Sequence, residues 1–130
     1  GSLLIIWTLF FADVQAVEKA DPVLTTARSL QASGNNEGAI TEYLRYLFFH
    51  PTAENLSDVY VGLGTAYLRL NQWERAKAAW RQSVRLAPDD STKNALRINL
   101  AIQSVAHRNY SLAVLELLKV SSFAPQPFLR

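Results

Sequence analysis

Histidine and cysteine are the side chains most often used for nucleophilic, proton-transfer and metal-binding chemistry, and this chain has few of them. It contains no cysteine, and its two histidines, His50 and His107, lie far apart in the sequence. Each histidine falls at the end of a predicted helix, where interaction with the helix dipole is its ordinary role. The pattern therefore predicts no metal site and no catalytic base.

Two other patterns carry chemistry in some proteins. Gly62-Leu63-Gly64 has the spacing of a phosphate-binding loop, but the third glycine is missing and the motif lies inside a predicted helix. Ser33, Ser57 and Ser91 fall at turns or helix starts, where a hydroxyl caps backbone N–H groups. We expect no catalytic residue, no cofactor and no metal, and we interpret the chain as non-enzymatic.

Composition and charge describe one modest domain or a short repeat array. The 130 residues are 49% hydrophobic and 18% charged, which supports a single core. Thirteen Lys and Arg against eleven Asp and Glu leave a net charge of +2, too small for the dense basic surface that binds nucleic acid. We therefore expect no nucleic-acid partner.

Residues 1–19 form an apolar N-terminal segment. Leu3 to Ala12 contains one polar residue, Thr8, and is about half the length of a membrane-spanning helix. It matches the apolar region of a secretory signal, with small or branched residues near Ala16 for cleavage. Three interpretations stay open: an export signal, the end of a membrane anchor, or a helix packed on the protein. The first two predict an exported or membrane-associated protein, such as one of the bacterial periplasm or envelope, and the third a cytoplasmic one.

Beyond this segment the apolar residues follow helical spacing, and strand periodicity is nowhere sustained. Asp21-Pro22 predicts a helix start, the stretch 33–36 predicts a break, and a turn is expected around Asn71. Pro51, Pro88 and Pro125 each predict the end of a helix. The prediction is an all-α chain of six helices of about 13 residues each, with an extra apolar helix at the N-terminus.

The helices repeat in pairs. Residues 57–90 resemble a tetratricopeptide (TPR) repeat over 34 residues, with seven of the eight signature positions filled by the expected type: Tyr60, Leu63, Gly64, Tyr67, Ala76, Trp80 and Pro88. The template fits less well at 20–53, where Tyr46 is too large, and at 94–127, where Arg97 and Ser104 depart from it. Three residues separate successive repeats, so equivalent residues are 37 apart, and 128–130 would begin a further element.

The resemblance implies a right-handed superhelix of antiparallel helix pairs that serves as a protein-interaction scaffold, with the first helices lining a concave groove. By register the groove residues would be Leu24, Arg28, Gln31, Asp58, Val61, Thr65, Leu68, Arg69, Ile98, Asn99, Ile102 and Val105. The Lys, Asn and Arg clamp with which one TPR subtype holds a terminal carboxylate is absent. The apolar members of the set predict a protein or peptide partner that offers an apolar helix or extended segment, unless some of them pack on a neighbouring repeat.

Two further features carry expectations of their own. Lys77, Arg81 and Arg85 form a basic stripe near Arg75, which we interpret first as a solvated helix face and second as a contact for an acidic partner or anionic membrane. Helical spacing predicts that most aromatic side chains lie in the core: Tyr43, Tyr46, Phe48, Phe49, Trp73 and Trp80.

The last predicted helix is apolar over most of its circumference, which predicts that something covers it. Either further repeats follow or another chain packs there. One hypothesis is that Leu3 to Phe11 of a neighbouring molecule docks on this C-terminal apolar face and builds a homo-oligomer. The alternative to an interaction scaffold is therefore a structural self-assembly module, in which the N-terminal segment can also serve as the membrane contact.

Overall fold

Six α-helices follow one another along residues 21–123, the part of the chain that the computed structural model describes, with side chains described through residue 120. They are α2 (Pro22–Ala32), α3 (Asn36–Phe49), α4 (Leu56–Arg69), α5 (Trp73–Arg85), α6 (Asp90–Ala106) and α7 (Tyr110–Phe123). Within this part there is no strand, which agrees with the all-α prediction. The expected N-terminal helix, Pro125 and the element expected from residue 128 lie outside it.

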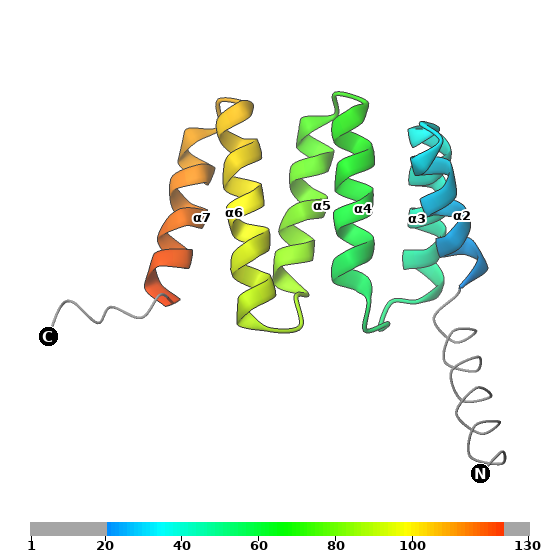
Figure 1. Ribbon diagram of the computed structural model, residues 1–130, viewed down its shortest axis with the longest axis horizontal. Helices are drawn as coiled ribbons and strands as arrows, with labels where there is room; N and C mark the ends of the chain where they lie inside the picture. The colour runs from blue at the N-terminus through cyan, green and yellow to red at the C-terminus, as the bar shows by residue number, and fades with distance from the viewer. Residues whose placement is uncertain (1–20, 124–130) are drawn as a thin grey trace, which may run out of the picture.

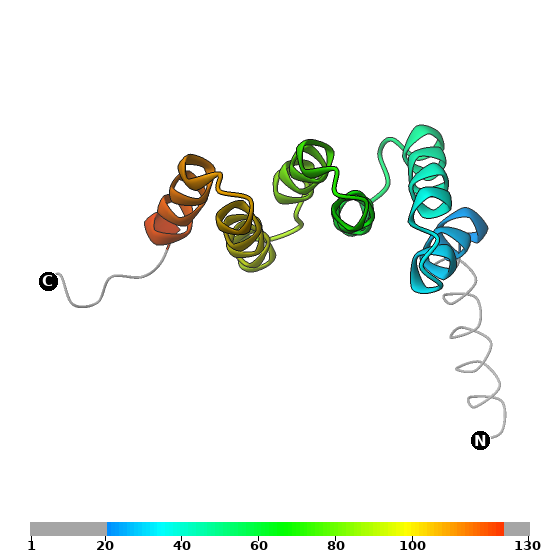
Figure 2. The ribbon, with the colours of Figure 1, turned by 90° about the horizontal axis from the view of Figure 1, so that it is seen from above.

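The helices form three antiparallel pairs in a row, and each helix packs on those before and after it in the chain (Figure 1). Seen from above, α4 and α6 lie in one row and α5 and α7 in another (Figure 2). Helix pairs of this kind are the expected unit of a helical repeat. The right-handed superhelix stays a prediction.

The turns inside the three pairs have the same geometry. Gly34, Asn71 and Arg108 are spaced 37 residues apart and have φ values of 88°, 57° and 58°. The residue after each donates its N–H to the carbonyl five residues back, over 2.8–2.9 Å, which closes the preceding helix. A left-handed residue is costly for any side chain except glycine, so its recurrence shows that the repeat imposes one backbone path on different residues.

The starts of α2 and α6 follow local capping rules. Asp21 Oδ1 accepts hydrogen bonds from the N–H groups of Val23 at 2.9 Å and Leu24 at 3.2 Å, with Pro22 at the first helical position. Asp89 caps α6 through the N–H of Thr92 at 2.7 Å. The predicted start at 21–22 and the break at 33–36 are confirmed.

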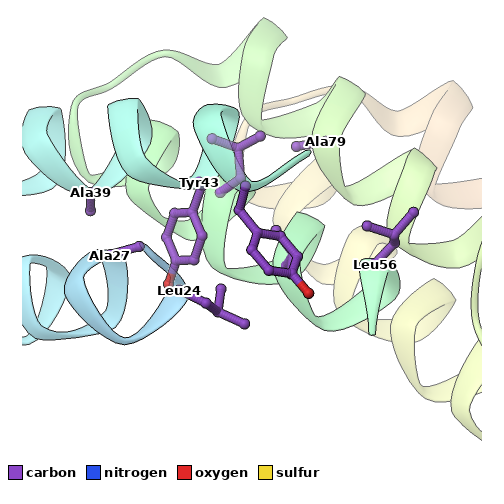
Figure 3. Close-up of a cluster of buried hydrophobic side chains, with 9 residues drawn as sticks. Leu24, Ala27, Ala39, Tyr43, Leu56 and Ala79 are labelled. Carbon is purple, nitrogen blue, oxygen red and sulfur yellow. The ribbon is translucent and has the colours of Figure 1, made fainter. Parts of the chain in front are cut away.

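One cluster of buried residues joins α2, α3 and α4 to α5 (Figure 3); it comprises Leu24, Ala27, Ala39, Tyr43, Tyr46, Leu56, Val59, Leu63 and Ala79. A second joins α5 to α6 and α7 through Ala76, Trp80, Leu100 and Leu112. Small residues lie where paired helices touch. At Gly64 a Cβ would come within 2.6 Å of Trp80 Cδ1, so α4 and α5 meet there at the closest distance that glycine allows.

The aromatic prediction is right for some residues and wrong for others. Tyr43, Tyr46 and Trp80 are buried, but Phe48 and Phe49 are 78% and 67% exposed. Both lie on the last turn of α3, on a side that no other described helix covers. Helical spacing alone indicates which residues share a face, and it leaves open what covers that face.

The polar residues that depart from the repeat pattern are accommodated by hydrogen bonds. The Tyr46 hydroxyl donates to Asn55 Oδ1 at 2.8 Å. The buried hydroxyls of Ser83 and Ser104 donate to the carbonyls of Trp80 at 2.6 Å and Leu100 at 2.7 Å. Each bond satisfies a polar group that would otherwise cost free energy in the core.

Candidate partner-binding surfaces

The apolar residues predicted on the first helix of the third repeat are exposed. Ile98, Ile102 and Val105 lie on α6 with 42%, 60% and 51% of their surfaces accessible. Their spacing of four and three residues places them on one face of the helix. Exposed large apolar side chains that share one helix face are typical of a contact surface for a partner.

Leu24 was predicted to line the groove, but the structure buries its side chain in the core. It is 2% exposed and belongs to the core between α2, α3 and α4, because it lies on the face of α2 that packs on α3. Its side chain therefore stabilises the first repeat and offers almost no surface to a ligand.

Gln31 holds the first two repeats together. Its Nε2 donates to the Gly62 carbonyl at 3.1 Å, and its Oε1 accepts from the Tyr43 hydroxyl at 2.6 Å. Burial raises the pKa of the Tyr43 phenol, and the nearby Arg28 charge opposes this only in part. The phenol thus stays protonated as a donor, so Gln31 acts as a link between α2, α3 and α4.

The remaining predicted groove residues divide by exposure. Arg28, Asp58 and Arg69 are exposed, and the half-buried ones are Val61, Thr65, Leu68 and Asn99. The Thr65 hydroxyl donates to the Val61 carbonyl at 2.9 Å within α4. The predicted set is therefore a mixture of surface and supporting positions.

A cavity of about 450 Å³ lies between α5, α6 and α7. Its lining is strongly cationic and consists of Arg81, Gln82, Val84, Arg85, Lys93, Arg97, Leu100, Glu116 and Lys119. We call it the cationic pocket. Five Lys and Arg side chains face a single carboxylate there, so the local field favours an anion.

Glu116 lines the cationic pocket and is buried, with 4% of its surface exposed. Arg97 Nε is 3.7 Å from its Oε2, and Lys119 Nζ is 3.4 Å from its Oε1. A separation of 3.7 Å is longer than a hydrogen bond, so Arg97 and Glu116 form a loose ion pair. Both are largely buried, and such a pair is weak evidence for stabilisation of the fold.

The predicted basic stripe divides along α5. Lys77 Nζ pairs with Glu74 at 2.6 Å, and Arg75 lies 5.9 Å from the centre of the Tyr67 ring. Arg81 and Arg85 instead line the cationic pocket, where Gln82 Oε1 accepts two hydrogen bonds from Arg85 at 3.0 and 2.8 Å. The sequence alone did not indicate the partners of these arginines, although Arg97 departs from the repeat pattern at this position.

A second cavity, of about 590 Å³, lies beside the start of α2 and the α3–α4 connection, lined by Asp21, Leu24, Arg28, Tyr46, His50, Ala53, Glu54 and Asn55. His50 Nε2 lies 3.4 Å from Asp21 Oδ2, and the ring packs on Tyr46. His107 stacks on Trp73 with the ring centres 4.2 Å apart. Both histidines follow the last residue of a helix, as expected.

α7 carries the apolar surface predicted for the last helix. Val114, Leu115, Leu117 and Leu118 are about half exposed, while Leu112 is buried. Among residues 21–123, α7 packs mainly on α6, and its buried Leu112 also joins the cluster that includes Ala76 and Trp80 of α5. The described chain therefore leaves an open apolar surface at its C-terminal end.

The described residues hold no group of three or more acidic, histidine or cysteine side chains suited to a metal ion. In the same part of the chain, no helix combines the length and hydropathy needed to cross a bilayer.

Comparison with known families agrees with the geometry of the helix pairs. The family model of the tetratricopeptide repeat matches residues 57–90, the span of α4, α5 and the loop that follows. No curated protein and no solved structure was found to match the chain. Repeats of this family typically serve as non-catalytic modules for protein–protein interaction. Residues 57–90, the central helix pair of this chain, are therefore similar to a tetratricopeptide repeat.

Proposed function

We propose that the chain is a scaffold that binds an apolar helix or extended segment of a protein partner on its first helices. The observation that carries this is the exposed stripe of Ile98, Ile102 and Val105 on α6. Each such side chain contributes about 1.5–3 kcal/mol when fully removed from water. Half-buried Val61 and Leu68 on α4, which lies in the same row as α6 (Figure 2), would extend the contact.

Selection of peptides from a random library by the full chain, followed by binding measurements, tests this function. We expect the selected peptides to be apolar and to lose at least about tenfold in affinity for Ile102→Glu. Val114→Glu is the matched control, because it places the same charge at an apolar position of α7 with similar exposure. Loss of binding with Val114→Glu and not with Ile102→Glu would place the contact elsewhere.

Self-assembly is the second candidate, and the exposed apolar residues of α7 favour it specifically. The occupant would be the apolar stretch Leu3 to Phe11 of a neighbouring molecule. Light scattering coupled to size exclusion would compare the full chain, a chain without residues 1–16, and Leu118→Glu. An oligomer that both changes convert to monomer supports assembly, and a monomeric full chain excludes it.

The same N-terminal composition supports a place in a larger exported or membrane-anchored protein. N-terminal sequencing of the protein isolated from cells that produce it naturally tests the export signal. A mature chain that begins at Val17 supports cleavage after Ala16, and a chain that retains Leu3 to Ala12 in a soluble fraction contradicts both export and anchoring.

A further inference from the structure

We propose that the cationic pocket between α5, α6 and α7 is a second binding site, which takes an acidic segment of a protein partner with carboxylates on alternate residues. The site lies between second helices and α6 and uses none of the apolar stripe residues. It therefore goes beyond the scaffold function proposed above and does not depend on it.

Comparison of equivalent positions shows that the pocket is a specific feature of one repeat junction. Tyr60 and Ala79 of the central repeat, which share a cavity of about 300 Å³, correspond to Arg97 and Glu116 of the third. Three of the four other cationic wall positions, Arg81, Arg85 and Lys93, correspond to apolar residues one repeat earlier, namely Leu44, Phe48 and Leu56, and the fourth, Lys119, corresponds to Gln82. A junction of this fold can thus be built largely from uncharged residues.

Burial of charge has a cost that apolar residues avoid. Arg97 and Glu116 keep only 13% and 5% of their side chains exposed, so both charges are removed from water at a desolvation cost. In the pocket, the pair positions the Arg97 guanidinium beside Lys93, in a wall that already carries Arg81 and Arg85.

The charge balance of the pocket selects an anion. Five cationic side chains surround it, and Glu116 neutralises one of them. Gln82 holds the Arg85 guanidinium through two hydrogen bonds, which reduces the side-chain entropy that binding would cost. Guanidinium groups bind carboxylates with two parallel hydrogen bonds, and such charge-assisted bonds are about twice as strong as neutral ones.

The spacing of the cations favours an extended peptide over a single small anion. Arg81 and Arg85 on α5 are four residues apart, as are Lys93 and Arg97 on antiparallel α6. Four residues of helix rise about 6 Å, and alternate residues of an extended peptide are about 6.7 Å apart. Two carboxylates on alternate residues of a peptide are therefore spaced to contact two cationic side chains that lie four residues apart on a helix. The volume of about 450 Å³ is within the range of ligand pockets.

The test is fluorescence anisotropy of the full chain with a labelled peptide in which glutamate alternates with serine. A glutamine–serine peptide is the neutral control. The variant Arg81→Glu/Arg85→Glu reverses two pocket charges, and Arg28→Glu/Arg69→Glu reverses two exposed charges on the first helices. Both variants change the formal net charge from +2 to −2, so they separate the pocket from overall charge. Circular dichroism would check that both stay helical.

We expect Arg81→Glu/Arg85→Glu to weaken binding of the acidic peptide by at least about tenfold and the control variant by less than about threefold. Affinity should fall as salt is raised. Equal losses in the two variants would overturn the proposal, as would equal binding of the neutral peptide. Displacement of the peptide by an equal concentration of inorganic phosphate would also overturn it, because the pocket would then bind phosphate. Ile102→Glu should leave this binding unchanged, so the two proposals fail separately.

Discussion

The two junctions between successive repeats differ in the chemistry of their outward surfaces. Between the first and second repeats, the outward residues of α3 are Leu44 and Phe48; between the second and third, the equivalent residues of α5 are Arg81 and Arg85. The equivalent position on the following helix also changes from an uncharged to a cationic residue, from Tyr60 on α4 to Arg97 on α6. Apolar and cationic side chains thus occupy equivalent outward positions of the two junctions, although both junctions join one helix pair to the next.

Positions that form the turns and the closest helix contacts vary little. The left-handed turn residue recurs at Gly34, Asn71 and Arg108. Small residues recur at the closest helix contact, at Ala27, Gly64 and Ala101 in the first helices, where each is buried. Because a larger side chain there would separate the helices, these positions serve packing. Binding is expected where equivalent residues differ.

The largest effect is expected when the ion pair at the second junction is broken. Glu116→Ala installs the residue of the first junction but leaves the buried Arg97 without its carboxylate, so we expect a loss of about 3 kcal/mol in the free energy of unfolding. Urea unfolding would measure it. The double variant Arg97→Tyr/Glu116→Ala reproduces the pair Tyr60 and Ala79, and it should recover most of this loss. A double variant as unstable as Glu116→Ala would show that the junctions are not interchangeable.

The next effect concerns the helix contact at Gly64. Alanine occupies the equivalent positions 27 and 101, yet Gly64→Ala should destabilise the chain by about 2 kcal/mol, because its Cβ would lie 2.6 Å from the buried Trp80 ring. A double-mutant cycle with Trp80→Phe, followed by thermal unfolding, would show the cause. The cost of Gly64→Ala should shrink in the Trp80→Phe background, and an unchanged cost would contradict the steric explanation.

A smaller effect is expected from the different starts of α4 and α6. α4 has no side-chain cap, whereas hydrogen bonds from the N–H and hydroxyl of Thr92 lower the pKa of Asp89 at the start of α6. Because the folded pKa lies below the unfolded value, the contribution of Asp89 is present above about pH 4. It is lost as the pH falls through the lower, folded pKa. Comparison of Tm against pH for wild type and Asp89→Asn should show a smaller acid-induced decrease in the variant. Parallel curves would contradict the role of this carboxylate.

The smallest effects are expected at the outward positions. Phe48→Gln and Arg85→Gln should each change the free energy of unfolding by no more than about 0.5 kcal/mol, because both residues are exposed and outside the two core clusters. Arg85→Gln should nevertheless weaken binding of the acidic peptide. A large loss of stability in either variant would show that these outward residues help to stabilise the fold.

Sequence alone predicted much of the local structure and only part of the candidate sites. The cap at Asp21, the turn at Asn71 and the central repeat were predicted correctly. Arg81 and Arg85 were recognised as a stripe, and Ile102 was placed on an accessible face. Leu24 was misplaced, because register against a family template assigns a face to a residue without showing how closely the next helix approaches it.

The chain by itself indicated where helices begin and end, the 37-residue spacing and the positions of turns, because caps, glycine and proline act within a few residues of the backbone. Only the tertiary structure decided that Phe48 is exposed and that Lys93, Arg97 and Lys119 meet Arg81 and Arg85 around one buried carboxylate. Such groupings depend on how three helices pack together. Helical periodicity orients the side chains of each helix, and the distance and tilt of the neighbouring helices determine which of them meet.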